Sequence, residues 1–220
     1  MTADPLFLSS DAAQAFIRKG YGDELGVCVQ PWDGVHVSAE QFADGDFAGV
    51  QMQAMQLVPT SPETQTDSVC CHRFCSEMQP LFPGVTVFEK DGRLRVVFCG
   101  TPKAQHNYLE AFSFLNAARK RQLVRLLART GCLPVYYPQD AQVLLRAGKL
   151  PDGRMLILFL NTGTDPLDAV PLTFAEPPVQ ITRLLADGTE KKVAFCQSGG
   201  ETVLDCRSEM MDPLLLIAAY

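Results

Sequence analysis

Hydrophobic residues near the start of the chain follow helical spacing. Ala12, Ala13, Ala15, Phe16 and Ile17 recur at the three- and four-residue intervals of one helix face. Ser9-Ser10-Asp11 supplies a serine cap and an acid for the first turn, and Lys19-Gly20 is a typical helix end. A short apolar strand at residues 26–29 and an alternating, half-buried strand at 50–54 are predicted next, with loops at 30–49 and 61–68.

The middle of the chain predicts a β-hairpin and then a long helix. Apolar runs at 85–88 and 94–99 flank Asp91-Gly92, a typical two-residue hairpin turn. Residues 108–130 predict the helix, with Leu123, Leu126 and Leu127 as its apolar stripe and Gly131 as its stop.

After Gly131 the pattern changes to short apolar runs separated by turn pairs such as Asp152-Gly153 and Asp187-Gly188. This spacing is typical of an antiparallel sandwich. We therefore expect an α/β layer followed by a small all-β antiparallel sandwich. The predicted domains are residues 1–148 and 149–220.

Composition and charge exclude some functions. Hydrophobic residues make up 47% of the chain, enough for a folded core, and the net charge of −6 argues against nucleic-acid binding. The basic run Arg119-Lys120-Arg121, with Arg125 and Arg129, predicts a solvated helix face, with a phosphate-binding patch as the alternative. The longest apolar runs, 155–160 and 214–220, are too short to span a bilayer, and no signal peptide is recognisable. These features predict a cytoplasmic protein with no membrane partner.

Eight cysteines are present, without the spacing of a disulfide framework. Cys28, Cys99, Cys132 and Cys196 lie in or beside apolar segments, where a reduced thiol behaves as a small hydrophobe. Cys70-Cys71-His72-Arg73-Phe74-Cys75 is the densest cluster of metal-ligand types, but zinc normally needs two separated ligand pairs. We predict no metal there; the alternative recruits His36 or His106 to Cys71 and Cys75.

No short motif marks a catalytic or cofactor site. Cys99 follows a predicted strand as a nucleophile would, with His36, His72 and His106 as candidate bases, but the flanking glycines of a nucleophile elbow are absent. A buried structural thiol is the favoured interpretation. Trp32, Tyr136 and Tyr137 are the candidate ligand residues, because aromatic rings can stack on sugars, although core roles are more common for such residues.

Three stretches in order give the chain a family resemblance. They are the segment from Asp11 through Lys19-Gly20-Tyr21-Gly22-Asp23-Glu24-Leu25-Gly26-Val27; Asp91-Gly92-Arg93-Leu94-Arg95-Val96-Val97-Phe98-Cys99-Gly100-Thr101-Pro102; and Asp152-Gly153-Arg154-Met155-Leu156-Ile157-Leu158-Phe159-Leu160-Asn161-Thr162. Together they resemble the C-terminal region of bacterial β-galactosidase-like glycoside hydrolases. The resemblance implies an incomplete amidotransferase-like α/β domain used in assembly and a C-terminal β-sandwich, without the catalytic barrel and its two glutamates.

Three functions follow as hypotheses. The first is a non-catalytic accessory or assembly module, partnered by copies of itself or by a glycosidase catalytic domain, with no activity in this chain alone. The second is a carbohydrate-binding module that uses the exposed aromatics. The third is a small amidotransferase-type cysteine hydrolase centred on Cys99. For the first, we expect a homo-oligomer formed through an uncovered α/β sheet around residues 27–29, 50–54 and 94–99; the alternative is that residues 30–84 fold back and cover it.

Overall fold

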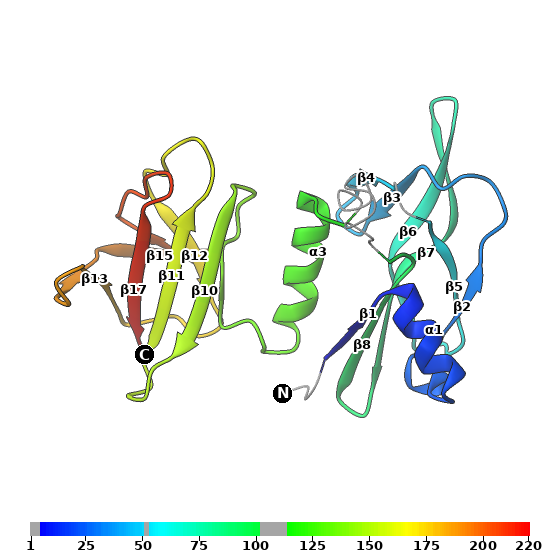
Figure 1. Cartoon of the computed structure of the whole chain (residues 1–220), viewed down its shortest axis with the longest axis horizontal. Helices are drawn as coiled ribbons and strands as arrows, with labels where there is room; N and C mark the ends of the chain where they lie inside the picture. The colour runs from blue at the N-terminus through cyan, green and yellow to red at the C-terminus, as the bar shows by residue number, and fades with distance from the viewer. Residues whose placement is uncertain (1–4, 51–52, 102–113) are drawn as a thin grey trace. The chain divides into compact units, whose positions relative to one another are not determined.

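The computed structural model describes residues 5–50, 53–101 and 114–220. The chain forms two compact units, Met1–Thr130 and Gly131–Tyr220 (Figure 1). Each unit has hydrophobic clusters of its own. The division therefore falls at residue 130 and not near residue 148, which lies inside the first hairpin of the C-terminal unit.

A six-stranded sheet in the order β1-β8-β7-β6-β3-β4 forms the centre of the N-terminal unit. All neighbours are antiparallel except β1 and β8. Its strands are β1 (Leu6–Leu8), β3 (Ala39–Phe42), β4 (Phe47–Gly49), β6 (Gln65–Phe74), β7 (Glu77–Lys90) and β8 (Arg93–Phe98). A two-stranded antiparallel sheet joins β2 (Val27–Pro31) to β5 (Met55–Pro59).

Helices and the small sheet cover the two faces of the large sheet. Alternate residues of β8 belong to different clusters: Val96 and Phe98 pack with Leu126 of α3 (Ala117–Ala128). Val97 and Cys99 belong to the cluster that contains residues of α1 (Ser10–Arg18), β2 and β5. A single 3-10 turn, η1 (Gly22–Glu24), connects α1 to β2.

The predicted amidotransferase-like α/β layer is wrong. A parallel sheet needs long crossover connections, whereas β6, β7 and β8 are joined by two-residue turns. The predicted uncovered sheet is also absent, because Val27, Val29, Val50, Ala54 and Cys99 are buried. Residues 30–84 instead supply β3, β4 and β6 of the large sheet and β5 of the small sheet that covers it, together with α1 and β2. Within the predicted strand 50–54, residues 51 and 52 lie outside the described chain.

Several local predictions are confirmed. The Ser9 hydroxyl accepts a hydrogen bond from the Ala12 amide at the start of α1, and Gly20 has φ +89° just after the Lys19 cap. The β7–β8 hairpin turns at Asp91 and Gly92, whose φ values of 52° and 71° are those of a type I′ turn. Of the predicted helix 108–130, the described part contains α3, and residues 108–113 lie outside the described chain.

The C-terminal unit consists of two antiparallel sheets around one core. One has the order β10-β11-β17-β13-β14 and the other β15-β16-β12-β9. Ile157, Phe159, Leu172, Leu204 and Leu216 are fully buried between them. The strands are β9 (Val135–Tyr136), β10 (Val143–Lys149), β11 (Met155–Asn161), β12 (Val170–Phe174), β13 (Gln180–Leu184), β14 (Glu190–Lys192), β15 (Phe195–Ser198), β16 (Glu201–Leu204) and β17 (Pro213–Ala219).

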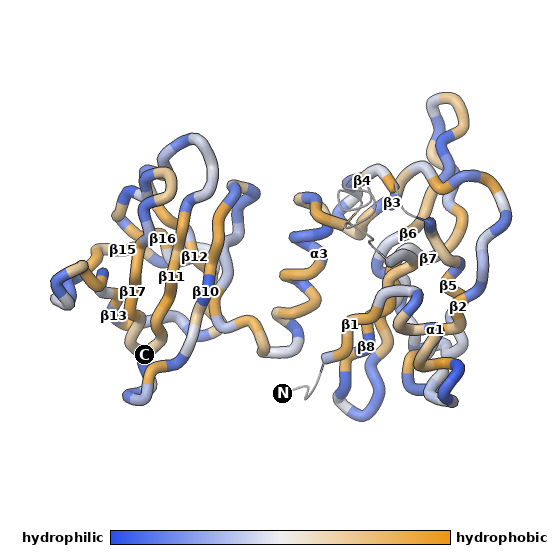
Figure 2. Tube along the Cα trace, in the orientation of Figure 1, coloured by the Kyte–Doolittle hydropathy of each residue, from blue (hydrophilic) through white to orange (hydrophobic). Residues whose placement is uncertain are grey.

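Hydropathy follows this architecture. The strands of both units carry the hydrophobic residues, and the turns between them are mostly hydrophilic (Figure 2). Within the described residues, no helix is both long enough and apolar enough to cross a bilayer.

Candidate functional site

The three aromatic candidates are divided between the two units: Trp32 belongs to the N-terminal unit, and Tyr136 and Tyr137 belong to the C-terminal unit. Trp32 follows β2, and its ring packs on Phe82 with 4.9 Å between centroids. The backbone at Gly34 lies so close that a Cβ there would be 2.4 Å from the indole. The Trp32 indole N–H donates to the Val35 carbonyl at 2.8 Å. The half-buried indole is therefore held by its own loop and by the core.

Tyr136 and Tyr137 lie in the C-terminal unit. Tyr137 is only 3% exposed, packs on Phe159 at 5.5 Å and donates its hydroxyl to Gln139 at 3.1 Å. Burial raises the pKa of the Tyr137 phenol. Tyr136, on β9, is half-buried and pairs with Thr173. Tyr137 is thus a core residue, and sugar stacking by Trp32 or Tyr136 stays a prediction.

Cys99 lies in the core beside another thiol. Its Sγ is 3.5 Å from that of Cys70, and both residues are buried. The contact with Cys99 and burial raise the pKa of the Cys70 thiol far above its ordinary value. His72 is at the surface, where its ring nitrogen contacts the His36 carbonyl at 2.8 Å, and His106 lies outside the described residues. Among the described residues, Cys99 therefore lacks the exposed thiol–histidine arrangement that a cysteine nucleophile uses.

The Cys70–Cys75 cluster is spread along β6 and its turn. Cys70 is in the core, Cys71 contacts the Val69 carbonyl, and Cys75 is exposed at the turn into β7. No group of three or more candidate metal ligands is found in the described part of the chain. The strand geometry explains the separation, because successive side chains point to opposite faces.

The basic run on α3 is paired with carboxylates. Arg119 and Glu40 form an ion pair in which each side chain is 1% exposed. Arg119 also donates to Gln122, and the Ser68 hydroxyl donates to Glu40. The guanidinium lies over three rings, those of Phe42, Phe98 and Phe114, at 5.0, 5.1 and 5.3 Å.

The other arginines of the helix continue this pattern. Arg121 binds Asp44 at 3.0 Å and also Asp46, while Arg125 binds Asp67 at 2.8 Å. Arg129 binds Glu89 at 3.4 Å. The prediction of a solvated face is wrong for Arg119, which is buried. Each of these arginines forms an ion pair with a carboxylate, so less basic surface is left to bind a phosphate. The run joins the helix to the sheet.

Two hollows lie on the N-terminal unit. A polar cleft of about 540 Å³ at the Lys90 end of β7 is lined by Glu63, Gln65, Val87, Glu89, Lys90, Asp91 and Arg129. An apolar groove of about 330 Å³ lies between β1 and α3, lined by Phe7, Leu8, Ser9, Phe98, Phe114, Leu123 and Leu127. The cleft has mixed charges, and three of them, Glu89, Arg129 and Lys90, are neutralised in the Arg129–Glu89 and Lys90–Glu24 pairs.

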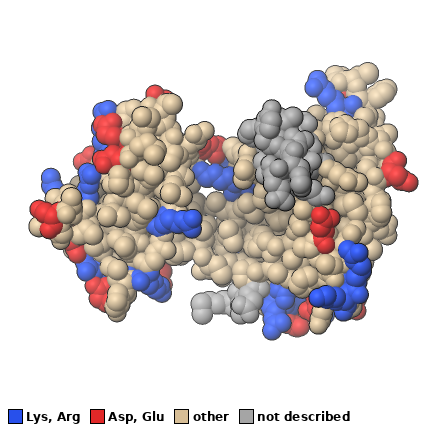
Figure 3. Space-filling model, in the orientation of Figure 1, with Lys and Arg blue, Asp and Glu red and all other residues tan. Residues whose placement is uncertain are grey.

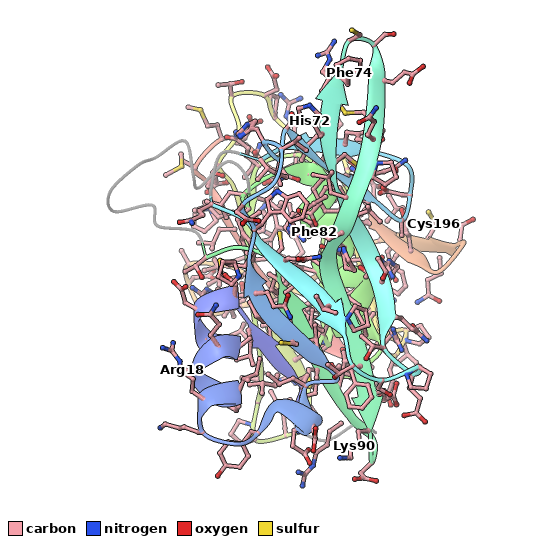
Figure 4. All side chains as sticks on the ribbon, turned by 90° about the vertical axis from the view of Figure 1, so that its right-hand side faces the viewer. Arg18, His72, Phe74, Phe82, Lys90 and Cys196 are labelled. Atoms are coloured by element: carbon pink, nitrogen blue, oxygen red, sulfur yellow. The ribbon has the colours of Figure 1, made fainter. Side chains whose placement is uncertain are left out.

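The β6–β7 hairpin extends beyond the rest of its unit. Residues 73–80 are all exposed, and Phe74 is 59% exposed at the outer end. Figure 4 shows Phe74 at the tip and Phe82 further in along β7, where it is buried. Sequence reasoning missed this arm, because its strands contain polar residues, prolines and cysteines in place of a clear alternation.

The outer face of the five-stranded sheet in the C-terminal unit is unusually apolar. Side chains alternate along strands, so the residues opposite the core of β10, β11, β17 and β13 point outward. They include the following aliphatic residues, of which Leu144 is exposed, Ile217 is buried and the others are half-buried: Leu144, Leu156, Leu158, Leu160, Leu184, Leu215 and Ile217. An outward sheet face is normally polar. In Figure 3, the face of this unit turned to the viewer is largely uncharged. We call this surface the leucine face.

The fold is shared with part of a known glycoside hydrolase. No family model and no curated protein matches the chain. Among solved structures, an α-L-fucosidase, isoenzyme 2 from Paenibacillus thiaminolyticus, is similar with a TM-score of 0.55 and 13% sequence identity. The match covers 89% of this chain and 34% of the fucosidase, so the chain spans about a third of that enzyme. At this identity the likeness establishes a common fold; the resemblance to β-galactosidase-like enzymes stays a prediction.

Proposed function

We propose that this chain is an accessory and assembly module of a glycoside-hydrolase-type protein, acting through its surfaces and not through a catalytic centre of its own. The observation that carries the proposal is the fucosidase match, which covers nearly all of this chain but only a third of the enzyme. A glycosidase barrel alone takes about 250 residues. The 220 residues here are largely occupied by two β-rich units.

The described polar groups support the same proposal. The best-formed polar cluster, Glu40 with Arg119, is enclosed by phenylalanine rings and joins a helix to a sheet. Cys99 is enclosed by the core. Besides the polar cleft, three described surfaces present apolar side chains: the hairpin tip with Phe74, the groove beside β1 and the leucine face. Exposed apolar patches of this kind are typical of association surfaces.

A turnover assay tests this proposal. The purified chain is incubated with nitrophenyl α-L-fucoside, β-galactoside and β-glucoside, beside a known fucosidase as the positive control. We expect no release of nitrophenol above the buffer rate. Turnover that persists through purification, and that a single Asp→Asn or Glu→Gln substitution in the polar cleft abolishes, would overturn the proposal.

A titration separates this function from carbohydrate binding. Trp32 is the only tryptophan, so its fluorescence reports directly on one of the predicted stacking residues. An assembly module should show no saturable change with L-fucose or galactose. Saturable binding that calorimetry detects, and that Trp32→Phe or Tyr136→Ala abolishes, favours the carbohydrate-binding module.

A further inference from the structure

The leucine face contains one cross-strand row with opposite charges at its two ends. Strand pairing aligns Arg146 with Leu158, Leu158 with Leu215, and Leu215 with Leu184. Leu184 in turn aligns with Glu190 on the outermost strand, β14. The row therefore runs from a cation on one edge strand, across three leucines, to a carboxylate on the other edge strand.

The two charges differ in their present partners. Glu190 accepts hydrogen bonds from Thr182 at 2.8 Å and Arg154 at 2.9 Å, which hold its pKa below the ordinary value. A carboxylate has about four acceptor positions, so Glu190 can accept more. The Arg146 side chain is exposed and has no hydrogen bond or ion pair to any residue in the described ranges.

We propose that a second copy of this chain covers the leucine face in a two-fold symmetric dimer, with Arg146 of each copy opposite Glu190 of the other. A two-fold axis parallel to the strands and passing over β17 reverses the order of the strands in the facing sheet. The row in one copy therefore faces the same row in the other copy, with the residues in the opposite order. Leu215 faces Leu215, Leu158 faces Leu184, and each Arg146 faces a Glu190. An isologous interface requires this kind of self-complementarity.

The neighbouring row is compatible with the same axis. It aligns Gly148, Leu156, Ile217, Thr182 and Lys192. Reversal places Lys192 of one copy over Gly148 of the other, which has no side chain and where nothing lies within 4 Å of the position that a Cβ would take. The lysine therefore lies directly over no bulky side chain and no like charge; the next outward residue of that strand is Arg146, which faces Glu190.

The size of the face sets the expected strength of the dimer. Four strands about 4.8 Å apart, over about six residues each, make a surface of about 400 Å². A stable interface of standard size buries about 800 Å² on each partner. The leucine face is thus the centre of an interface, and its charged edges must supply the rest of the buried area. We expect a weak dimer that forms in a concentration-dependent way.

Sedimentation equilibrium of the full chain tests the inference. The mass should rise from 24.2 kDa toward twice that value as concentration increases. Leu215→Asp, which places two carboxylates at the axis, should leave the chain monomeric, with circular dichroism confirming that it is folded. A mass of 24.2 kDa for the natural chain up to millimolar concentration would overturn the inference. So would a folded Leu215→Asp variant that dimerises as tightly as the natural chain.

A charge exchange tests the register and remains informative if Leu215→Asp does not fold. Arg146→Glu and Glu190→Arg each create two like-charge contacts in their own homodimers, and each should raise the dissociation constant about tenfold or more. Mixed in equal amounts, the two variants should dimerise about as tightly as the natural chain, because both contacts become opposite-charge pairs. Lys149→Glu is the matched control: it makes the same charge change on β10, but on the other side of the strand. Equal weakening by Lys149→Glu, or no recovery on mixing, means that the proposed register is wrong.

This inference goes beyond the proposed function and fails separately from it. Glycosidase turnover by a chain that still dimerises through Leu215 would overturn the proposed function alone. A strictly monomeric chain without turnover would overturn the dimer alone.

Discussion

Arg119 is one of the largest fully buried side chains in the described part of the N-terminal unit. It joins α3 to β3 through Glu40, and three aromatic rings exclude water from the pair. A buried ion pair contributes little net stability compared with an apolar pair, but removing one partner leaves an uncompensated buried charge. The Nε of Arg119 already has no hydrogen-bond partner within the described part of the chain. The pair therefore fixes the position of the helix more than it adds to the free energy of folding.

Arg119→Met should lower the free energy of unfolding of the N-terminal unit by about 3–5 kcal/mol, because Glu40 is left charged and buried. Urea unfolding followed by Trp32 fluorescence measures this. Arg121→Met is the control on the same helix; its exposed ion pairs should be worth about 1 kcal/mol or less. The double variant Glu40→Leu with Arg119→Met should recover most of the loss. Equal effects of the two single variants would show that burial of the pair is not what matters.

The Cys70 thiol makes stability depend on pH in the alkaline range. Its pKa is raised above the ordinary 9.0 by the contact with Cys99 and by burial. The folded chain therefore keeps this proton at a pH where the unfolded chain releases it. The contribution of this thiol to the free energy of unfolding is complete below about pH 9. It falls as the pH rises, by up to about 1.4 kcal/mol per pH unit.

Urea midpoints measured by Trp32 fluorescence between about pH 8 and 10 should decrease more steeply for the natural chain than for Cys70→Ala. Other groups, such as lysines and tyrosines, titrate in both proteins and cancel in this comparison. Cys75→Ala is the control, because that thiol is exposed at the hairpin turn. Parallel pH profiles for the natural chain and Cys70→Ala would contradict the prediction.

At the scale of elements, Gly84 allows β7 to pass beside the buried carboxylate. A Cβ on Gly84 would lie 2.8 Å from the Glu40 carboxylate oxygen and 2.9 Å from its carbon. Those atoms cannot move away freely, since Arg119 and Ser68 both hold them. The glycine is thus required by close approach, and no unusual backbone angle is involved.

Gly84→Ala should destabilise the N-terminal unit by roughly 1–3 kcal/mol through overpacking. Gly22→Ala in the same unit is the matched control, because its new methyl group would meet Ile17 at 3.8 Å, an ordinary contact. That substitution should be neutral or stabilising by up to about 1 kcal/mol, through reduced freedom of the unfolded chain. Urea unfolding followed by Trp32 fluorescence compares them, and a neutral Gly84→Ala would mean that Glu40 and Arg119 can shift together.

Elements with strong local signals were predictable, and elements held by distant contacts were not. The Ser9 cap and the Asp91-Gly92 turn carry their own chemistry, so α1 and the β7–β8 hairpin were found. β3 was missed because a charged residue such as Glu40 is typical of a loop in the sequence. Its burial is explained only by the ion pair with Arg119, which lies far along the chain. The start of β6 was missed for the same reason, since polar Ser68 belongs to that buried network. These errors turned an antiparallel sheet into a predicted α/β layer.

The leucine face shows the same limit. The apolar runs 155–160 and 214–220, which belong to the predicted sandwich, form β11 and β17. The structure buries one side in the sandwich core and leaves the other on the outer face of its unit. Only strand register brings Arg146 and Glu190 to opposite ends of one row, and register depends on four separate pairings that no single segment encodes.

At the scale of the whole molecule, the fucosidase match and the open apolar surfaces support one interpretation. Most of the chain shares its fold with about a third of a glycoside hydrolase, and the proposed function assigns its apolar surfaces to protein binding. If two copies bind through the leucine face, then folding of the C-terminal unit is linked to dimerisation. Linkage of this kind makes thermal stability depend on protein concentration.

The midpoint of thermal unfolding of the C-terminal unit should therefore rise with chain concentration. A hundredfold increase in concentration stabilises a dimer by about 2.7 kcal/mol. The dimer contains two C-terminal units, one from each copy, of about 90 residues each. With about 2.1 cal/mol/K of unfolding entropy per residue, the stabilisation corresponds to an increase in the midpoint of roughly 5–8 °C. Scanning calorimetry measures the shift, and Leu215→Asp should show none. The prediction fails if the midpoint of the natural chain does not change with concentration over a range in which sedimentation detects the dimer. The C-terminal unit would then keep its fold when the copies separate, and folding and dimerisation would not be linked.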